Sequence, residues 1–563
     1  MFAKRPAKAG LEGSESPLDT ETKKFTESSL LCPITKDTPP RGPKVAPSRE
    51  STANYGNFQG SCIFGHVRKG IRIQITNVTS DPEGTSIMAT TPPSRCWNIP
   101  RRYILAIMCN LAFFLRGWTI TNLVMIFYHL LILEENDRET HFPTLGNFTQ
   151  KDNANMQKTF DSAFIIGQIP AAIIIILVSP YQIMQYSMIL SAFLQLITPW
   201  TIQISTALFF TTIFIQGLCA CPLDCASIGL WKEWAPSTER TGLLMVAFSG
   251  QYIYYQISIP LCLFLSETVG PVSLHYFAGI AGVIWCILWN NLMSGSPSSD
   301  PLISKTELKY ITDNVPLENK ENISLSTIPL KSILKSLPVL ALCFVFLSSA
   351  VSSRSMVYFV VIQAQLMLSG YNGEWMVWVL VLNCILTVPA AGYLVDFLIN
   401  RKIAETTTMR KIMCSGGLSL HAIFTMLFMV PDTFSALICL KISLLIFPFT
   451  LAGALPNVLD LSPRFSCVIM GAAMTVFSIS RMLYDLFLEH LIIDWSVREW
   501  IVNFIPVEML AIWAAILFAV FGSGKEQVWS CQSPSSEDRT EERDSQHYPQ
   551  TNLEDEVLIS ERL

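Results

Sequence analysis

The stretch YILAIMCNLAFFLRGWTITNL, residues 103–123, decides the fold class, because it is apolar and has the length of about twenty residues that a membrane-crossing helix needs. Twelve such segments occur, six before and six after a polar stretch at residues 295–336. Further examples are Thr159–Val178, Leu243–Ser266, Phe277–Met293, Trp375–Val395 and Ile501–Phe521. Two sets of six spans are typical of secondary transporters with a substrate path between their halves. We therefore predict an all-α membrane protein with 12 transmembrane helices in two six-helix halves.

The composition agrees with a protein that lies in a lipid bilayer. Of the 563 residues, 50% are hydrophobic and 15% are charged, and the mean hydropathy is +0.40. A soluble protein of this composition would have too little charged surface. Basic residues stand at the ends of apolar segments and form no stripe, so no nucleic-acid partner is expected. The sequence contains no nucleophile–base, phosphate-loop or metal signature, so we do not expect an enzyme.

Polar segments divide the chain into five parts. Residues 1–97 are rich in Pro, Ser, Thr, Lys and Glu without helical or strand periodicity, which predicts a disordered cytoplasmic extension. The first six-helix half is then predicted at 98–294, a cytoplasmic central loop at 295–336, and the second half at 337–522. Residues 523–563 are again polar and are predicted to be a disordered cytoplasmic tail.

The distribution of basic residues predicts the orientation of the spans. The predicted outer loops contain few of them: Arg138, Lys151, Lys158 and Arg498. Because cytoplasmic loops carry an excess of Lys and Arg, both termini are predicted to be cytoplasmic. The sequon Asn147-Phe148-Thr149 then falls in the first outer loop, residues 134–158. We therefore predict a glycan on Asn147.

A motif after the eighth span resembles the inner-loop signature of the major facilitator superfamily. Residues 392–402 read GYLVDFLINRK and contain Gly392, Asp396, Arg401 and Lys402 at the signature positions. The glycine allows two helices to approach closely. The aspartate can lie against a helix end or a basic partner and so latch the two halves in one state. The equivalent place in the first half, VSPYQIM at residues 178–184, has no charge.

A second motif indicates a narrower family. The loop WKEWAPSTER, residues 231–240, resembles the W-x-K-W-A-P-P-x-E-R loop of the solute carrier family that contains vesicular glutamate transporters, sialin and type I sodium-dependent phosphate transporters. Further matches are Gly167–Pro170, Ile215–Gly217, Leu330–Pro338, Met409–Lys411 and Asn457–Arg464. The resemblance covers roughly residues 100–530, and Leu330–Pro338 looks most like the phosphate branch. It implies alternating-access transport of a small organic or inorganic anion, such as phosphate or urate, driven by Na⁺, H⁺ or membrane potential, without a cofactor.

Four polar positions of the glutamate branch are uncharged in this chain. The resemblance places Ile120, Gln157, Ile213 and Ala220 at its first-span basic residue, second-span histidine, fourth-span arginine and fourth-span acidic residue. Glutamate-type chemistry is therefore not carried over to these sites. Two functions stay open: an anion transporter with altered selectivity, and a non-transporting scaffold or sensor on the same fold.

Arg354 matches the seventh-span arginine of the same branch. A guanidinium inside a membrane segment is costly unless it faces a cavity or an acidic partner. Its planar fork is well suited to a carboxylate or a phosphate. We expect an anion near the bilayer midplane, bound by Arg354 and by the hydroxyl of Tyr358 one turn away. The alternative is a structural pair between Arg354 and a buried carboxylate.

Arg116 in the first span is the second candidate for binding an anion. It lies one turn before Ile120 on the same helical face and could replace the lost charge. The alternative is pairing with another helix or a place at the lipid interface. Asp161 and Asp224 are carboxylates that could pair with Arg116. Either could instead bind the coupling ion, since Na⁺ prefers oxygen ligands and a carboxylate can take up H⁺.

Other polar residues in the spans are interpreted as structural. Arg481 and Asp485 are four residues apart and are predicted to neutralise each other along one helix face. Three cysteines in the fourth span resemble a metal-binding run (Cys219, Cys221 and Cys225). Residues two apart do not share a helix face and no histidine is close in sequence, so we interpret these cysteines as packing residues and expect no metal site.

The C-terminal tail contains a candidate sorting signal. Glu554 stands four residues before the pair Leu558-Ile559, as in acidic dileucine signals that clathrin adaptors bind. The alternative is an ordinary solvated acidic tail. If the signal is used, the protein is expected at the plasma membrane with an additional pool in endosomal vesicles.

Overall fold

The computed structural model describes residues 99–135, 150–270, 272–315, 328–368, 383–427, 433–491 and 497–531. All of these belong to one compact unit, residues 93–563. They are helical with short connections, and no β-strand occurs among them. Several predicted sites lie outside the described residues: Asn147, Glu554, Leu558, Ile559 and the side chain of Tyr358.

In the part of the first half that the structure describes, eight helices account for six spans. They are α1 (Arg101–Glu135), α2 (Gln150–Leu177), α3 (Pro180–Ile204), α4 (Thr206–Ala220), α5 (Pro222–Trp234), α6 (Arg240–Phe248), α7 (Gly250–Thr268) and α8 (Ser273–Leu292). The fourth span is divided into α4 and α5 at Pro222, because a proline has no N–H to donate to the preceding turn and fits a helix start. The fifth span is divided into α6 and α7 at Ser249.

The central segment contains short helical elements. They are η1 (Pro297–Ser299), α9 (Lys305–Asn314) and α10 (Leu330–Lys335). The hydroxyl of Ser304 caps α9 by accepting a hydrogen bond of 3.1 Å from the backbone N–H of Glu307. The predicted central loop is therefore partly helical in the residues that the structure describes.

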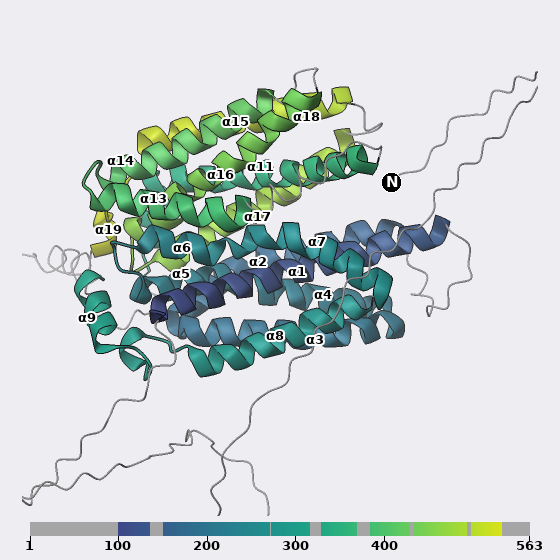
Figure 1. Cartoon of the computed structure of the whole chain (residues 1–563), viewed down its shortest axis with the longest axis horizontal. Helices are drawn as coiled ribbons and strands as arrows, with labels where there is room; N and C mark the ends of the chain where they lie inside the picture. Colours follow the sequence, from purple (N-terminus) through teal and green to yellow (C-terminus); the bar gives the residue numbers. More distant parts are fainter. Residues whose placement is uncertain are drawn as a thin grey trace, which may run out of the picture. The chain divides into compact units, whose positions relative to one another are not determined.

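The described part of the second half contains long helices and short helical turns. They are α11 (Leu337–Leu368), the π-helical turn η3 (Asn383–Thr387) with α13 (Val388–Asn400), α14 (Thr406–Lys411), the π-helical turn η4 (Ile412–Gly416) with α15 (Gly417–Leu427), α16 (Thr433–Leu461), α17 (Ser466–Leu491), α18 (Val497–Phe521) and α19 (Val528–Cys531). In Figure 1 these helices lie above those of the first half, and most run along the long axis of the picture.

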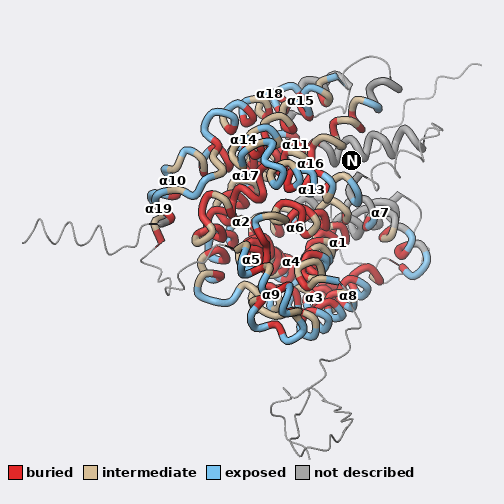
Figure 2. The backbone as a smooth tube through the Cα atoms, turned by 60° about the vertical axis from the view of Figure 1, so that its left-hand side comes forward, coloured by how far each residue is buried: buried red, intermediate tan, exposed pale blue. Residues whose placement is uncertain are grey.

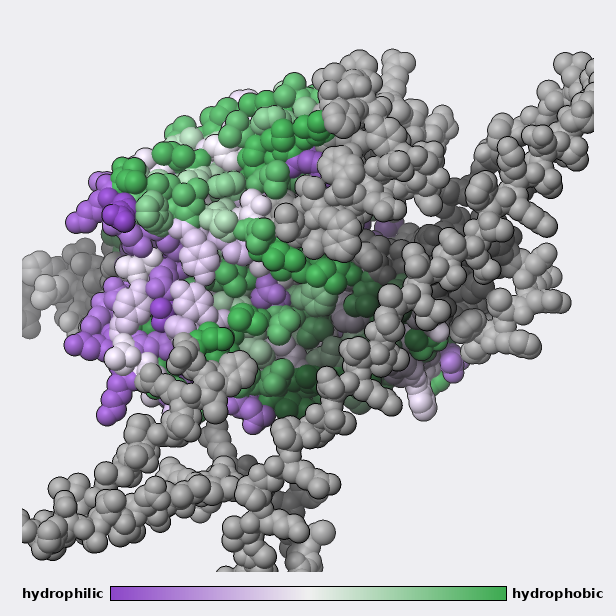
Figure 3. All heavy atoms as spheres, in the orientation of Figure 1, coloured by the Kyte–Doolittle hydropathy of each residue, from purple (hydrophilic) through white to green (hydrophobic). Residues whose placement is uncertain are grey.

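The described helices have the apolarity that a bilayer requires. Among the described ranges, nine helices are long and apolar enough to cross a membrane, and Ile385–Asn400 is a shorter apolar helix. Figure 3 shows hydrophobic side chains along the flank of the bundle and hydrophilic ones at the end where Figure 1 places α9, α14 and α19. That end carries the predicted inner loops.

Buried residues lie where the two halves meet as well as inside each half (Figure 2). One hydrophobic cluster contains residues of α5 and α6 together with residues of α13, α16 and α17. Gly392 on α13 permits a close approach to α6: a Cβ there would lie 2.8 Å from Met245 Cβ and 2.9 Å from the carbonyl oxygen of Thr241. The glycine of the predicted motif therefore stands where the halves touch.

Candidate functional site

At the inner end of the bundle, a carboxylate of one half caps a helix of the other. Asp396 on α13 accepts hydrogen bonds from the backbone N–H groups of Thr241, at 3.1 Å, and Gly242, at 2.7 Å. Both belong to the first turn of α6, where N–H groups have no partner within the helix and the helix dipole is positive. Asp396 thus lies against a helix end of the other half, one of the two positions considered from the sequence.

A second carboxylate at this end binds an arginine from each half. Asp460 on α16 accepts from Arg240 of the first half at 3.2 Å and from Arg410 Nε of the second half at 2.7 Å. Arg410 also donates to the hydroxyl of Thr241 at 3.0 Å. Sequence reasoning did not assign Arg240, Arg410 or Asp460. All three stand inside the family motifs quoted above, and a charge inside such a motif was the signal that could have identified them.

Arg401 and Lys402, predicted for the same latch, lie apart from these contacts. Both are exposed at the end of α13. The guanidinium of Arg401 lies 5.4 Å from the ring centre of Phe397 on its own helix. Lys402 has a φ of 55°, which ends α13. Of the four predicted residues, the structure brings Gly392 and Asp396 to the other half.

Glu239, in the loop before α6, accepts hydrogen bonds from side chains of α1 and α9. It accepts from Arg102 Nε at 2.9 Å, from the Tyr103 hydroxyl at 2.9 Å and from the Tyr310 hydroxyl at 3.1 Å. Burial alone would raise the pKa of Glu239, but these hydrogen bonds and the charge of Arg102 outweigh it and hold the pKa below its usual value. Arg102 also pairs with Glu307 of α9 at 3.2 Å. The central segment is thereby fastened to the start of α1.

Inside the first half, Arg116 forms a pair between helices. Its Nη1 lies 2.5 Å from Asp224 Oδ2 on α5, and Asp224 also accepts from Gln251 of α7 at 2.7 Å. The guanidinium lies 5.0 Å from the ring centre of Phe113. The structure therefore brings Arg116 to Asp224, one of the two carboxylates considered from the sequence, and their roles in binding and coupling stay predictions.

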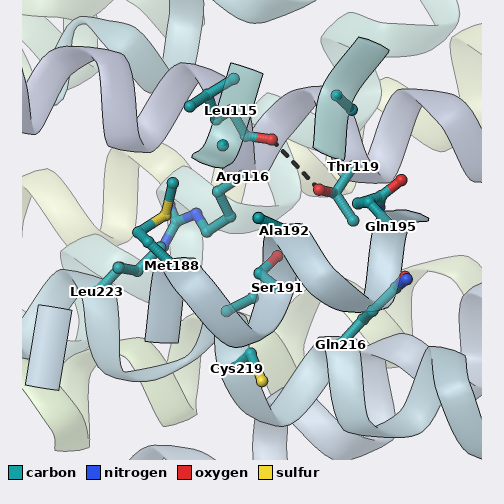
Figure 4. A pocket seen from close by; sticks show the side chains of 13 residues that line it. Leu115, Arg116, Thr119, Met188, Ser191, Ala192, Gln195, Gln216, Cys219 and Leu223 are labelled. Atoms are coloured by element: carbon teal, nitrogen blue, oxygen red, sulfur yellow. Dashed lines mark hydrogen bonds between the residues drawn. The ribbon is translucent and has the colours of Figure 1, made fainter. Parts of the chain in front are cut away.

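A small cavity lies beside Arg116 (Figure 4). Its polar lining comes from α1, α3 and α4 and includes Thr119, Ser191, Gln195 and Gln216. The volume of about 20 Å³ is enough for about one water molecule. An organic anion does not fit in this cavity in the described conformation.

Arg354 on α11 lies at the boundary between the halves. Its Nε donates to Asp485 Oδ1 of α17 at 2.7 Å. The Gln157 amide of α2, oriented with its oxygen toward Arg354, accepts from Nη2 at 2.6 Å and from Nη1 at 3.2 Å. One edge of the guanidinium therefore faces a carboxylate of its own half, and its two terminal nitrogens contact a neutral amide of the other half.

One turn away along α2 and α17, Asp161 pairs with Arg481 across the same boundary. This corrects the predicted Arg481–Asp485 pair: the two residues share one face of α17, but Arg481 binds α2 and Asp485 binds α11. Packing of α17 against both α2 and α11 makes these contacts available. We call Gln157, Asp161, Arg354, Arg481 and Asp485 the charge ladder.

Three arginines in the spans each pair with an aspartate. Within the described residues, three arginines and three aspartates form three ion pairs: Arg116–Asp224, Arg354–Asp485 and Arg481–Asp161. Both arginines predicted to bind an anion therefore contact a carboxylate. Whether Asp161 or Asp224 also binds a coupling ion stays a prediction.

Two of the four positions that are uncharged in this chain are packed in apolar surroundings. Ile213 and Ala220 are buried in a hydrophobic cluster with Phe160 and Phe209. Cys219, Cys221 and Cys225 are buried and form no disulfide. The Sγ of Cys467 on α17 lies 3.5 Å from the carbonyl oxygen of Cys225, so α5 and α17 also touch across the boundary.

Comparison with known proteins matches residues 159–484 to the model of the Major Facilitator Superfamily. Vesicular glutamate transporter 3 of Danio rerio is 27% identical, over 88% of this chain and 86% of that protein. Vesicular glutamate transporter 2 of Homo sapiens is 25% identical, over 88% and 87%. The probable vesicular glutamate transporter eat-4 of Caenorhabditis elegans is 26% identical, over 76% and 75%.

Proposed function

The chain belongs to the major facilitator superfamily, and on this premise we propose that it is a secondary transporter of a small anion that works by alternating access. The substrate is an organic or inorganic anion such as phosphate or urate, and Na⁺, H⁺ or membrane potential drives the transport. The similar proteins named above, vesicular transporters of the anion glutamate, support the anion class. The protein acts in the plasma membrane or in endosomal vesicles.

The surroundings of Arg354 carry this proposal. Asp485 accepts a hydrogen bond from Nε of Arg354, and the two terminal nitrogens of Arg354 contact the neutral amide of Gln157 on α2. An anion with two oxygens would accept two hydrogen bonds there in the bidentate geometry that the guanidinium favours, and its negative charge would add an attraction that the neutral amide lacks. The amide oxygen is therefore a group that an anion can replace.

The contacts at the inner end supply the second requirement of alternating access, a barrier that can open. Asp396 and Asp460 join the two halves at that end through α6. In the described state the inner end is closed. Release of the anion to that side requires these hydrogen bonds to break together, as in a rigid-body movement of one half against the other.

Uptake into proteoliposomes tests the proposal. The purified protein is assayed with labelled phosphate, urate and glutamate under separate Na⁺, pH and voltage gradients. We expect saturable uptake of one anion class and a loss of at least tenfold in Arg354→Lys, since an ammonium cannot present the planar fork. Arg401→Lys is the matched control, because Arg401 is exposed and contacts its own helix. Normal uptake by Arg354→Ala would reject the assignment of Arg354.

The alternative function is a non-transporting scaffold or sensor. The observation that favours it is the apolar packing of Ile213 and Ala220, where the glutamate branch has charged residues. A folded protein that neither binds nor takes up any of the three anions under any gradient would support this alternative.

A further inference from the structure

We propose that Arg481 is a second anion-binding residue and that Asp161 is a tethered competitor, a carboxylate that occupies the position of the anion until the anion replaces it. The inference rests on the proposed function, because it assumes that an anion enters the charge ladder. Asp161 and Arg481 thereby receive a role that the sequence motifs do not assign to them.

The first observation is which half each group belongs to. Arg354 and Arg481 are on α11 and α17 of the second half, whereas Gln157 and Asp161 are both on α2 of the first half. Gln157 and Asp161 are one helical turn apart, as are Arg481 and Asp485, so the two arginines stand at neighbouring levels of one boundary. At each level, an oxygen acceptor on α2 contacts a guanidinium of the second half.

The second observation is an asymmetry between the two arginines. Arg354 keeps the carboxylate of Asp485 in its own half when α2 moves away. The carboxylate paired with Arg481 comes from the moving partner, and the side chain of Arg481 itself is only 17% exposed. Removing one member of a buried ion pair leaves a charge in a poor solvent and is strongly unfavourable. Separation of α2 from α17 therefore favours the arrival of another anion at Arg481.

These observations combine into an exchange. Before the anion binds, α2 supplies one amide oxygen to Arg354 and one carboxylate to Arg481. The entering anion takes over both arginines, and α2 is released from the second half. The exchange conserves charge at the arginines, since one carboxylate leaves as one anion enters. Binding of the anion and loosening of the boundary are then the same event.

The experiment compares anion affinity among variants of the full-length protein. Phosphate, urate and glutamate are titrated against the purified protein in a thermal-shift assay, and KM and kcat for uptake are measured in proteoliposomes. For the anion that stabilises the natural protein, Asp161→Asn should lower the apparent Kd by about tenfold, because a charged competitor is removed. Arg481→Gln should raise the Kd at least tenfold.

Two further variants separate this exchange from a merely structural ion pair. The double variant Asp161→Asn/Arg481→Gln removes both charges, so that it folds without a buried unpaired charge, and it should bind as weakly as Arg481→Gln. Asp313→Asn, the same substitution at an exposed site on α9, should leave the Kd unchanged. If the Asp161–Arg481 pair matters only for packing, Asp161→Asn, like Asp313→Asn, will not lower the Kd.

The outcomes distinguish the two proposals. If the natural protein binds an anion but Asp161→Asn binds it equally or more weakly, the tethered competitor is refuted and the transporter is not. An unchanged Kd in Arg481→Gln refutes the second anion-binding residue in the same way. If the natural protein neither binds nor transports any of the three anions under any gradient, the proposed function fails, and this inference fails with it.

Discussion

Replacing Asp396 by Asn should open the inner end of the protein. Two different oxygens of Asp396 accept the N–H groups of Thr241 and Gly242. The amide keeps one oxygen and turns an NH₂ group toward the other N–H, so at least one charge-assisted hydrogen bond is lost. Such a bond contributes about 2 kcal/mol. At about 1.4 kcal/mol per tenfold change, the ratio of inner-closed to inner-open protein should fall roughly thirtyfold.

Alkylation of Cys467 measures this change. Cys467 is the second residue of α17, is 8% exposed and lies against α5 of the other half. A membrane-permeant maleimide reaches it when the halves separate at the inner end. If the inner-open form is rare and forms quickly compared with alkylation, the alkylation rate is proportional to the population of the inner-open form. The rate, read by mass spectrometry of the Cys467 peptide, should therefore rise about thirtyfold in Asp396→Asn, by the same free-energy relation.

The control is Asp313→Asn, the same substitution at an exposed site on α9. It should leave the alkylation rate of Cys467 unchanged. If Asp396→Asn is folded, as size-exclusion chromatography and thermal unfolding would report, and its alkylation rate equals that of the natural protein, Asp396 does not hold the inner end closed. The argument from the hydrogen bonds to α6 would then be wrong.

Three further results are expected. The pKa of Glu239 is lowered in the folded protein. The contribution of Glu239 to stability is therefore complete above the usual carboxyl pKa and is lost as pH falls through the lowered value. Thermal unfolding between about pH 6 and pH 3 should show this loss of stability, and the loss should be smaller in Glu239→Gln. Asn147→Gln should abolish a glycosidase-sensitive mass shift of protein made in secretory cells, and persistence of the shift would contradict the assigned site. Leu558→Ala/Ile559→Ala should increase surface biotinylation, and an unchanged surface fraction would exclude the sorting signal.

The fold was predictable from the sequence because the length and apolarity of a membrane span are local properties. The stretch 103–123 lies within α1, and Phe277–Met293 nearly coincides with α8. The attachment of the central segment was not predictable in this way. It depends on Arg102 meeting Glu239 and Glu307, which are far away in the sequence and have no spacing that marks them as neighbours.

The candidate site was predictable in its residue types and less so in its pairings. A charge in an apolar segment is visible in one sequence, and this identified Arg354 and Arg116. The spacing of Arg481 and Asp485 indicated a pair within one helix, but α17 packs against α2 and α11, and partners on those helices replaced it. Which carboxylate an arginine binds is decided by how helices pack, and the spacing within one helix does not contain that information.

The three neutral ion pairs of the spans have an electrical consequence. Moving an elementary charge across the full thickness of the bilayer changes its electrostatic energy by about 2.3 kcal/mol at a membrane potential of 100 mV. Arg116–Asp224 and Arg354–Asp485 each move as a neutral unit within one half, so these two pairs displace little charge when the empty carrier changes state. Arg481 and Asp161 belong to different halves and displace charge only when they separate. A current recorded during turnover would then report the charge of the cargo, of any ion that travels with it and of the separation of Arg481 from Asp161.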